Sequence, residues 1–358
     1  MVSSLIVTII LISVLVIAHE FGHFIVAKKS GICVQEFSLG MGPKLVSSLK
    51  GDTEYSIRAL PFGGFCRMEG ETDDGEIGPN SFFNKSAGVR LAVMAAGPLM
   101  NFLLSFVMLF GLSCTSYIAK PEIRIVSENS PAQAAGLQAG DEIRRINGQR
   151  IHIYDELQNI LYQNGGRPIE LEILRDGELL RYELTPQYNE ERQTFLIGFS
   201  PEIYTGLLAE PAEGCEDAGF VDTAYYSYYS MLNYIKMTAQ GLARVFTFTA
   251  SQDEFGGPIT IFKMVGDGYE AGLEYSLKAA IQNVVYIGAI LGANLGVLNL
   301  FPIPGLDGGK ILFLLIEIVR RKPMNLETEG KLQFLGFMFL MLLMVFVIYG
   351  DIMKIFVK

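Results

Sequence analysis

The sequence predicts a polytopic α-helical membrane protein with four transmembrane helices and one exported α+β domain. Half of its 358 residues are hydrophobic and only 18% are charged, with a mean hydropathy of +0.33. A soluble protein carries about 25% charged residues, so part of this chain is expected in lipid. Long stretches without any charged residue flank one acidic polar block, and this division predicts separate membrane and exported parts.

Four stretches are long enough to span a bilayer, which requires about 20 mainly apolar residues. They are Val2 to Val26, Leu91 to Ala119, Ala279 to Leu306 and Leu332 to Gly350. The alternative for the first stretch is a secretory signal peptide. No Lys or Arg precedes it and no A-x-A-like cleavage site follows it, so we favour a membrane span.

The basic residues next to these stretches predict their orientation. All of them fall on one side if both termini lie outside, namely Lys28, Lys29, Lys85, Arg90, Arg320, Arg321 and Lys322. The positive-inside rule makes that side cytoplasmic. The stretch from Tyr225 to Ala250 would spoil this parity as a fifth span and carries Lys236 and Arg244. It is therefore predicted to be an amphipathic helix at the membrane surface.

The acidic excess of the chain lies in its central block. Residues 119–276 hold 24 acidic and 12 basic side chains, whereas the rest holds 14 and 16. No basic stripe is present to neutralise phosphates, which argues against nucleic-acid binding. The four cysteines lie far apart without a CxxC pair, which argues against a disulfide framework. The predicted domain ranges are 1–118, 119–200, 201–276 and 277–358.

Residues 119–200 predict a compact α+β domain. Strand patterns occur at 123–127, 142–146, 169–173 and 179–184, and helical patterns at 131–136 and 154–162. Asn147-Gly148 is a two-residue hairpin signal. The run Ser130-Pro-Ala…Ala-Gly-Leu…Ala-Gly-Asp-Glu-Ile…Ile-Asn-Gly148 closely resembles bacterial PDZ domains. That resemblance implies an extended peptide bound as an added strand beside a helix; the alternative is a PDZ-like spacer that binds no peptide.

The segment His19-Glu20-Phe21-Gly22-His23 carries the clearest chemical signal. Residues four apart on a helix share a face, so His19 and His23 can reach one metal ion. This HExxH spacing is typical of zinc metalloproteases, in which the Glu is the general base. The alternative is a buried polar cluster that joins helices. Because ionisable residues inside a span are costly, three of them in metal-binding register favour a functional site.

A catalytic zinc site needs a third protein ligand. His152, the remaining histidine, lies in the exported domain and is expected to be a solvated surface residue. Asp307 is the best carboxylate candidate, because Pro302 and Pro304 must open the backbone before it. The alternative is an Asp that only caps a broken helix. Glu317 is a weaker candidate that can reach Arg320 or Arg321 instead.

These motifs together resemble the site-2 protease family, and more narrowly the bacterial regulators of sigma-E protease. The resemblance rests on HEFGH, on Asn299 to Asp307 reading N-x-x-P-x-P-x-L-D-G, on the exported PDZ and on Gly97 to Asn101, which is similar to the family motif GxxxN. It runs essentially from end to end. The chain has room for one PDZ domain, whereas the best-known members of the sigma-E branch have two.

The resemblance implies Zn²⁺ held by His19, His23 and Asp307, with Glu20 as the general base and Asn299 positioning substrate. It also implies a re-entrant β-hairpin in the segment from Gly40 to Phe65, where the sequence by itself supports a Gly-rich loop. Such a hairpin would offer a strand edge to a substrate helix that has unwound locally.

We therefore expect a zinc-dependent intramembrane endopeptidase in the bacterial inner membrane, with both termini and the PDZ domain extracytoplasmic and the active site near the cytoplasmic side. Its substrate would be a single-span membrane protein already trimmed outside, such as an anti-sigma factor, or a remnant signal peptide. Two other classes remain: a catalytically inactive PDZ-bearing docking protein, and a metal transporter. The transporter explains neither Glu20 nor the PDZ domain.

Overall fold

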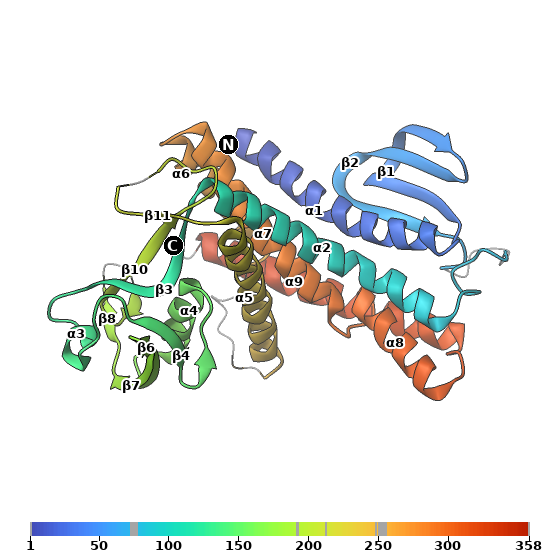
Figure 1. The fold of residues 1–358 in the computed structure, drawn as a ribbon. Helices are drawn as coiled ribbons and strands as arrows, with labels where there is room; N and C mark the ends of the chain where they lie inside the picture. The colour runs from blue at the N-terminus through green and yellow to red at the C-terminus, as the bar shows by residue number, and fades with distance from the viewer. Residues whose placement is uncertain are drawn as a thin grey trace. The chain divides into compact units, whose positions relative to one another are not determined.

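The structure is a computed structural model that describes residues 2–71, 78–190, 193–211, 213–247, 249 and 256–356. Its contacts divide the chain into two compact units. One unit comprises Met1–Met108 and Ile235–Lys358, and the other comprises Leu109–Tyr234. Long helices and a curled hairpin dominate the first unit, whereas the second is built around a sheet (Figure 1).

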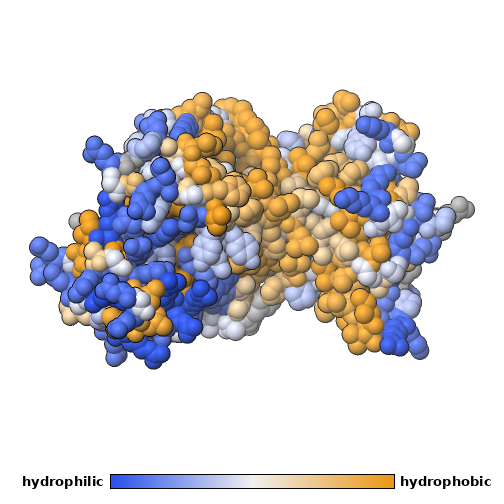
Figure 2. Space-filling view, viewed as in Figure 1, coloured by the Kyte–Doolittle hydropathy of each residue, from blue (hydrophilic) through white to orange (hydrophobic). Residues whose placement is uncertain are grey.

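The long helices of the described chain include four that could span a membrane by length and composition: α1, α2, α7 and residues 327–353 of α9. The bounds of the long helices are α1 (Val2–Lys29), α2 (Ala87–Thr115), α5 (Phe220–Phe246), α6 (Pro258–Leu273), α7 (Leu277–Leu300), α8 (Asp307–Arg320) and α9 (Leu326–Phe356). Hydrophobic side chains gather on the surface of the helices of the first unit (Figure 2). The four spans predicted from the sequence thus correspond to four apolar helices.

Two of the helices end earlier than the predicted spans. The second span was predicted to reach Ala119, but α2 ends at Thr115 and the next residues enter strand β3. The third was predicted to reach Leu306, but α7 ends at Leu300 because Pro302 interrupts the helical hydrogen bonds. Helix α8 was not predicted. Helix α5 covers most of the predicted amphipathic range, whose last residue, Ala250, lies outside the described residues.

Small and polar residues line the contacts between α1, α2 and α7. The buried residues of α1 follow one stripe: Ser4, Thr8, Leu11, Leu15, His19, Gly22, His23 and Ala27. On α7, a Cβ added at Gly288 would meet Leu11, one at Gly292 would meet Leu15, and one at Gly296 would meet Phe102. Glycines at four-residue spacing therefore let the helix backbones approach closely, as is common in membrane bundles.

The N-terminus of α6 is capped by a residue from α9. The carboxylate of Asp351 accepts hydrogen bonds from the backbone N–H groups of Gly257, Ile259 and Thr260, at 3.0 to 3.1 Å. It also accepts one from the Thr260 hydroxyl at 2.7 Å. Asp351 is 3% exposed. A buried carboxylate that satisfies free N–H groups at a helix start is favourable because the helix dipole is positive there.

Strands β1 (Val34–Lys50) and β2 (Thr53–Met68) form the curled hairpin of the first unit (Figure 1). Residues 34–39 pair with residues 64–68 on one side, and residues 36–39 pair with residues 54–57 on the other. Residues 64–68 therefore lie at an edge of this small sheet. The hairpin is longer than the predicted segment from Gly40 to Phe65, and its apolar side chains Leu45, Val46 and Leu49 are exposed.

A buried carboxylate holds the hairpin together. Glu36 Oε1 accepts hydrogen bonds from Ser56 Oγ at 2.6 Å and from Arg58 Nη2 at 2.7 Å. Burial alone would raise the pKa of Glu36, but these bonds and the charge of Arg58 outweigh burial and lower the pKa below its ordinary value. Glu36 is therefore ionised at neutral pH.

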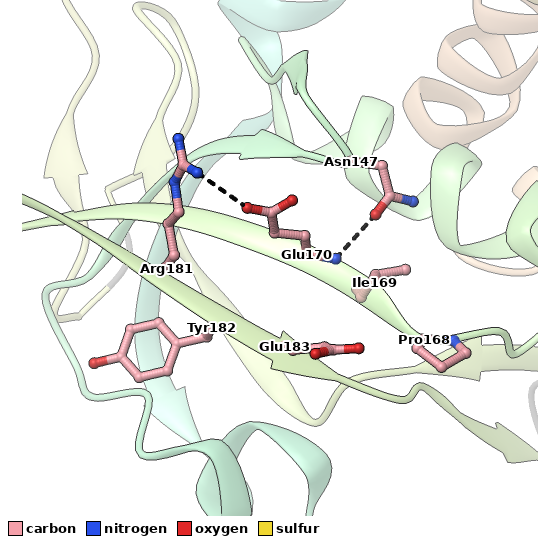
Figure 3. Close-up of a pocket in the computed structure, with 7 residues that line it drawn as sticks. All are labelled: Asn147, Pro168, Ile169, Glu170, Arg181, Tyr182 and Glu183. Carbon is pink, nitrogen blue, oxygen red and sulfur yellow. Dashed lines mark hydrogen bonds and ion pairs between the residues drawn. The ribbon is translucent and has the colours of Figure 1, made fainter.

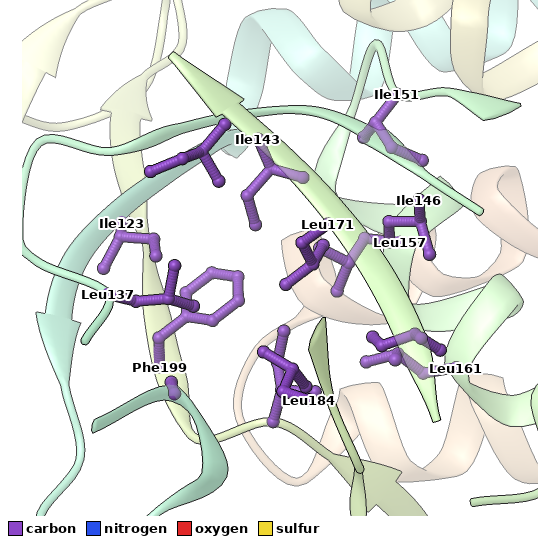
Figure 4. Close-up of a cluster of buried hydrophobic side chains, with 14 residues drawn as sticks. Ile123, Leu137, Ile143, Ile146, Ile151, Leu157, Leu161, Leu171, Leu184 and Phe199 are labelled. Atoms are coloured by element: carbon purple, nitrogen blue, oxygen red, sulfur yellow. The ribbon is translucent and has the colours of Figure 1, made fainter. Parts of the chain in front are cut away.

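The sheet of the second unit has the strand order β11-β10-β3-β4-β6-β7, with β5 paired to β4. Its strands are β3 (Tyr117–Val126), β4 (Glu142–Ile146), β5 (Gln149–Arg150), β6 (Ile169–Arg175), β7 (Glu178–Leu184), β10 (Phe199–Thr205) and β11 (Glu216–Asp217). A separate pair is formed by β8 (Gln187–Asn189) and β9 (Thr194–Leu196), and the short helices are α3 (Pro131–Ala135) and α4 (Tyr154–Asn164). The core contains Ile143, Leu157, Leu171 and Phe199 (Figure 4).

Local signals explain the turns of this unit. Asn147 and Gly148 both have positive φ, as do Asp176 and Gly177, which is what a two-residue hairpin loop requires. Helix α3 begins after Ser130, whose Oγ accepts a hydrogen bond from the backbone N–H of Gln133, and ends at Gly136 with φ 83°. These elements follow the predicted ones closely. Strands β8 to β11 were not predicted.

We expect Asp351→Asn to destabilise the protein, because the amide keeps one acceptor oxygen and loses the charge that faces three N–H groups. The expected loss is about 2 kcal/mol, typical of hydrogen bonds to a charged group. It would be measured as a lower thermal midpoint by circular dichroism in detergent micelles. Glu327→Gln on the same helix removes an exposed ion pair with Lys331 and should have almost no effect. Equal midpoints for the two variants would contradict the capping role.

Candidate metal centre

The structure brings together the three predicted metal ligands. Nε2 of His19 and Nε2 of His23 lie 3.1 and 3.3 Å from Oδ2 of Asp307, and 3.2 Å from each other. Among the described residues, His19, His23 and Asp307 form the group of side chains whose ligand atoms lie close enough together to hold one metal ion. Both histidines are less than 10% exposed.

The size of this triangle fits zinc. Zinc binds nitrogen and oxygen at about 2.0–2.2 Å with tetrahedral geometry, which places neighbouring ligand atoms about 3.3–3.5 Å apart. The three observed separations lie at or just below that value. In addition, Oδ2 of Asp307 is buried without a hydrogen-bond donor. A cation among these atoms would relieve the repulsion between their lone pairs.

The tautomer of His23 is set by the backbone of α2. Its Nδ1 lies 2.8 Å from the carbonyl oxygen of Val93. A carbonyl can only accept, so Nδ1 carries the hydrogen and, in the neutral ring, Nε2 keeps its lone pair. This arrangement orients Nε2 as a ligand, which is the usual role of the second hydrogen bond of a metal-binding histidine.

Two glycines permit the close contact of α1 with α2 at this site. A Cβ added at Gly97 would overlap the imidazole rings of His23 and His19. A Cβ added at Gly22 would overlap the backbone of Ala96. Any larger residue at either position would therefore push the histidines away from α2.

Asp307 reaches the site because the chain breaks just before it. After α7 ends, Gly305 adopts φ 99°, a conformation that residues other than glycine rarely take. Asp307 is then the first residue of α8. Gly308 and Gly309 pack so closely against the backbone of residues 300–304 that a Cβ would collide there. The Pro- and Gly-rich sequence thus forms a tight turn that presents the carboxylate.

Glu20 lies beside the triangle and is held by the hairpin. Its Oε2 accepts a hydrogen bond from the backbone N–H of Cys66 at 2.9 Å. Cys66 belongs to the edge segment 64–68 of β2, so the carboxylate lies against the edge of the small sheet.

Two asparagines contact Nδ1 of His19, the ring nitrogen that is not part of the triangle. Nδ2 of Asn299, the residue predicted to position substrate, lies 3.4 Å from Nδ1 of His19. Nδ2 of Asn101 lies 3.2 Å from the same atom. Asn101 belongs to the GxxxN motif but had no predicted role. Its contact with His19 joins residues 82 positions apart, and no local sequence pattern indicates such a contact.

Two sequence interpretations of other ionisable residues were wrong. Glu317 of α8 does not pair with Arg320 or with Arg321, the residue after this helix; it pairs with Arg90 of α2, which lies close only after the helices pack. His152 is not a solvated surface residue, because its ring stacks on Tyr229 at 3.8 Å between centroids and Nδ1 lies 3.3 Å from Glu156.

A pocket in the second unit is a weaker candidate for chemistry. It is lined by Asn147, Pro168, Ile169, Glu170, Arg181, Tyr182 and Glu183 (Figure 3). Arg181 pairs with Glu170 at 3.6 Å, and the backbone N–H of Glu170 donates to Asn147 Oδ1 at 2.9 Å. Arg181, Glu170 and Asn147 thus bond to one another, and the lining contains neither a His nor a Cys.

The apolar helices and the largely buried His-His-Asp triangle beside a glutamate define the class of membrane metalloproteases. A model of peptidase family M50 matches residues 7–343, and the chain belongs to this family. The predicted membership of the site-2 protease family and the predicted protease activity are therefore confirmed. The inactive docking protein is not favoured.

Proteins of similar sequence carry matching names. A protein named as a zinc metalloprotease from Clostridium perfringens is 38% identical, over 95% of this chain and 96% of its own length. Another from Clostridium acetobutylicum is 34% identical, over 98% and 97%. The regulator of sigma-W protease RasP from Bacillus subtilis is 29% identical, over 99% of each chain. The metal in these names is the predicted Zn²⁺.

A solved PDZ domain of an SdrC-like protein from Listeria monocytogenes covers 23% of this chain and 87% of that chain, with 19% identity and a TM-score of 0.22. A TM-score this low carries no argument about the fold.

We expect Gly97→Ala to weaken metal binding, because the new methyl group would overlap both imidazole rings. Overpacking costs about 1–3 kcal/mol, which corresponds to a roughly 5- to 150-fold loss of zinc affinity if the strain falls on the ligands. Gly111→Ala on the same helix is the control, since a Cβ there meets nothing within 4 Å. Zinc affinity measured by competition with a chromophoric chelator would decide; an unchanged value for Gly97→Ala would contradict the close contact.

Proposed function

We propose that the protein is a zinc-dependent intramembrane endopeptidase that cleaves the transmembrane segment of a previously trimmed single-span membrane protein. The observation that carries this proposal is the triangle of His19 Nε2, His23 Nε2 and Asp307 Oδ2, with sides of 3.1 to 3.3 Å, in a unit of apolar helices. Ionisable groups are costly in such a setting and are retained for function.

His19, His23 and Asp307 would hold the zinc ion, leaving one position open for water or substrate. When bound, zinc supplies Lewis-acid polarisation of the scissile carbonyl and lowers the pKa of water toward about 7. The packed ligands would keep this position fixed, because α1 lies directly against the backbone of α2 at Gly22 and Gly97, and Gly308 and Gly309 lie directly against the turn at residues 300–304.

Glu20 would act as the general base. Its Oε2 is occupied by the backbone N–H of Cys66, which fixes the carboxylate and leaves Oε1 to accept a proton from water. The same carboxyl group can then pass the proton to the leaving amine. Asn299, half-buried beside His19, would contact the substrate backbone.

The edge segment 64–68 of the hairpin would bind the substrate backbone. A transmembrane helix shields its carbonyl groups by its own hydrogen bonds, so it must unwind before cleavage and its freed N–H and C=O groups need partners. The N–H and C=O groups of this edge that do not bond to β1 or, at Cys66, to Glu20 would supply them by β-augmentation. The exposed apolar side chains of residues 45–49 support a hairpin that enters the membrane as a re-entrant element.

The substrate class follows from the family and the domain plan. The Bacillus subtilis relative is named as a regulator of sigma-W, which supports a membrane-bound regulator such as an anti-sigma factor as substrate; remnant signal peptides fit the same site. Residues 119–200 would be the PDZ domain, with residues 201–276 forming helices next to the membrane. The PDZ domain would bind an extracytoplasmic peptide or exclude substrates that have not been trimmed.

The membrane orientation would place both termini and the PDZ domain outside the bacterial inner membrane. This follows from the Lys and Arg residues that flank the spans. Lys28 and Lys29 end α1 only a few residues after His23, so the metal site would lie near the cytoplasmic face.

The test is cleavage of a tagged single-span protein without its extracytoplasmic domain, in liposomes containing the purified full-length chain. Glu20→Gln should keep zinc but lose about 10²- to 10⁴-fold in rate, the typical contribution of a general base. Asp307→Ala should lose both zinc and cleavage, and a zinc chelator should stop the wild type. Cleavage by Glu20→Gln at the wild-type rate would reject Glu20 as the base. A wild type that binds zinc and cuts no substrate would reject the protease.

A further inference from the structure

His19 differs from His23 in the partner of its Nδ1 atom. His23 Nδ1 faces a backbone carbonyl, whereas His19 Nδ1 faces the side-chain amides of Asn101 at 3.2 Å and Asn299 at 3.4 Å. If Nε2 of His19 is a metal ligand, it must hold a lone pair, and Nδ1 of the neutral ring must carry the hydrogen. That N–H needs an acceptor in this buried position.

The amide of Asn101 can provide the acceptor. With Nδ2 toward His19, two donors would face each other while Oδ1 of Asn101 is buried without a partner. A rotation of the amide by about 180° exchanges O and N at almost no steric cost. Oδ1 then accepts the N–H of His19, which replaces the contact between two donors by a hydrogen bond, and the amide nitrogen takes the position that the oxygen held.

Burial separates the roles of the two asparagines. A single N–H at Nδ1 is adequately satisfied by one acceptor at close range. Asn101 is 0% exposed and the nearer of the two, so it is enclosed by the protein and is not accessible to a substrate. Asn299 is partly exposed at the end of α7, so it is free to turn away from His19.

We propose that Asn101 is a positioning residue that accepts the Nδ1 hydrogen of His19, fixes the tautomer and ring orientation required for metal binding, and leaves Asn299 free for substrate. This inference rests on the metal site of the proposed function. The acceptor makes the imidazole of His19 a better ligand. Removing it should therefore weaken metal binding, even though Asn101 does not touch the metal.

The experiment compares the zinc affinity of the full-length protein in detergent with that of three variants of α2, and with that of His19→Ala as a test of the metal site itself. Asn101→Leu has nearly the same shape without an acceptor and should bind zinc about 10- to 100-fold more weakly, the usual effect of removing such a partner. Asn101→Asp keeps the acceptor and should bind at least as tightly as the wild type. Ser105→Ala is the matched control, because Ser105 is equally buried one turn along α2 and donates to the carbonyl of Ala289, not to His19.

Weak zinc binding by Asn101→Leu, with Asn101→Asp and Ser105→Ala close to wild type, is the expected result. Wild-type affinity in Asn101→Leu would overturn the proposal. A tenfold weaker affinity in Asn101→Asp would overturn it as well, and this variant decides the matter if Asn101→Leu does not fold. A wild type whose zinc binding is unaffected by His19→Ala would instead reject the metal site itself, which is a separate failure.

Discussion

The close approach of α1 and α2 is the constraint on which the metal site depends. The two helices can touch because Gly22 and Gly97 carry no side chains where the backbones cross, and the imidazole rings fill the space that a Cβ of Gly97 would occupy. From this contact follow the hydrogen bond of His23 to Val93 and the position of Asn101 beside His19. In lipid, where apolar burial adds little between helices, such close packing and buried hydrogen bonds are what hold helices together.

The candidate ligands could be predicted from the sequence because each obeys a local rule. His19 and His23 are four residues apart on one helix, so they share a face whatever surrounds them. Asp307 follows two prolines that must end a helix, and the chain indeed turns there. The turns of the second unit were predictable for the same reason, since Asn147-Gly148 and Asp176-Gly177 specify their backbone angles by themselves.

Features that depend on packing were not predictable. Glu317 was assigned to arginines near it in the sequence, whereas its partner Arg90 lies 227 residues away. Asn101 had no evident role until α2 placed it against His19. The hairpin was underestimated because Gly40, Gly42 and Pro61 suggest a loop, while pairing of residues 36–39 on both sides stabilises long strands despite them. In each case a tertiary contact outweighs the local preference.

The histidine ligands and the aspartate ligand of the metal site are synthesised at well-separated times. His23 and Asp307 are separated by 284 residues (307 − 23), which corresponds to tens of seconds of synthesis at about 5–20 residues per second. During that interval α1 already carries its two histidines and its glutamate, but the carboxylate that completes the triangle does not yet exist. A nascent chain therefore contains no assembled three-ligand centre while its own apolar segments are being inserted, and the site can form only after the turn before α8 has packed against α1.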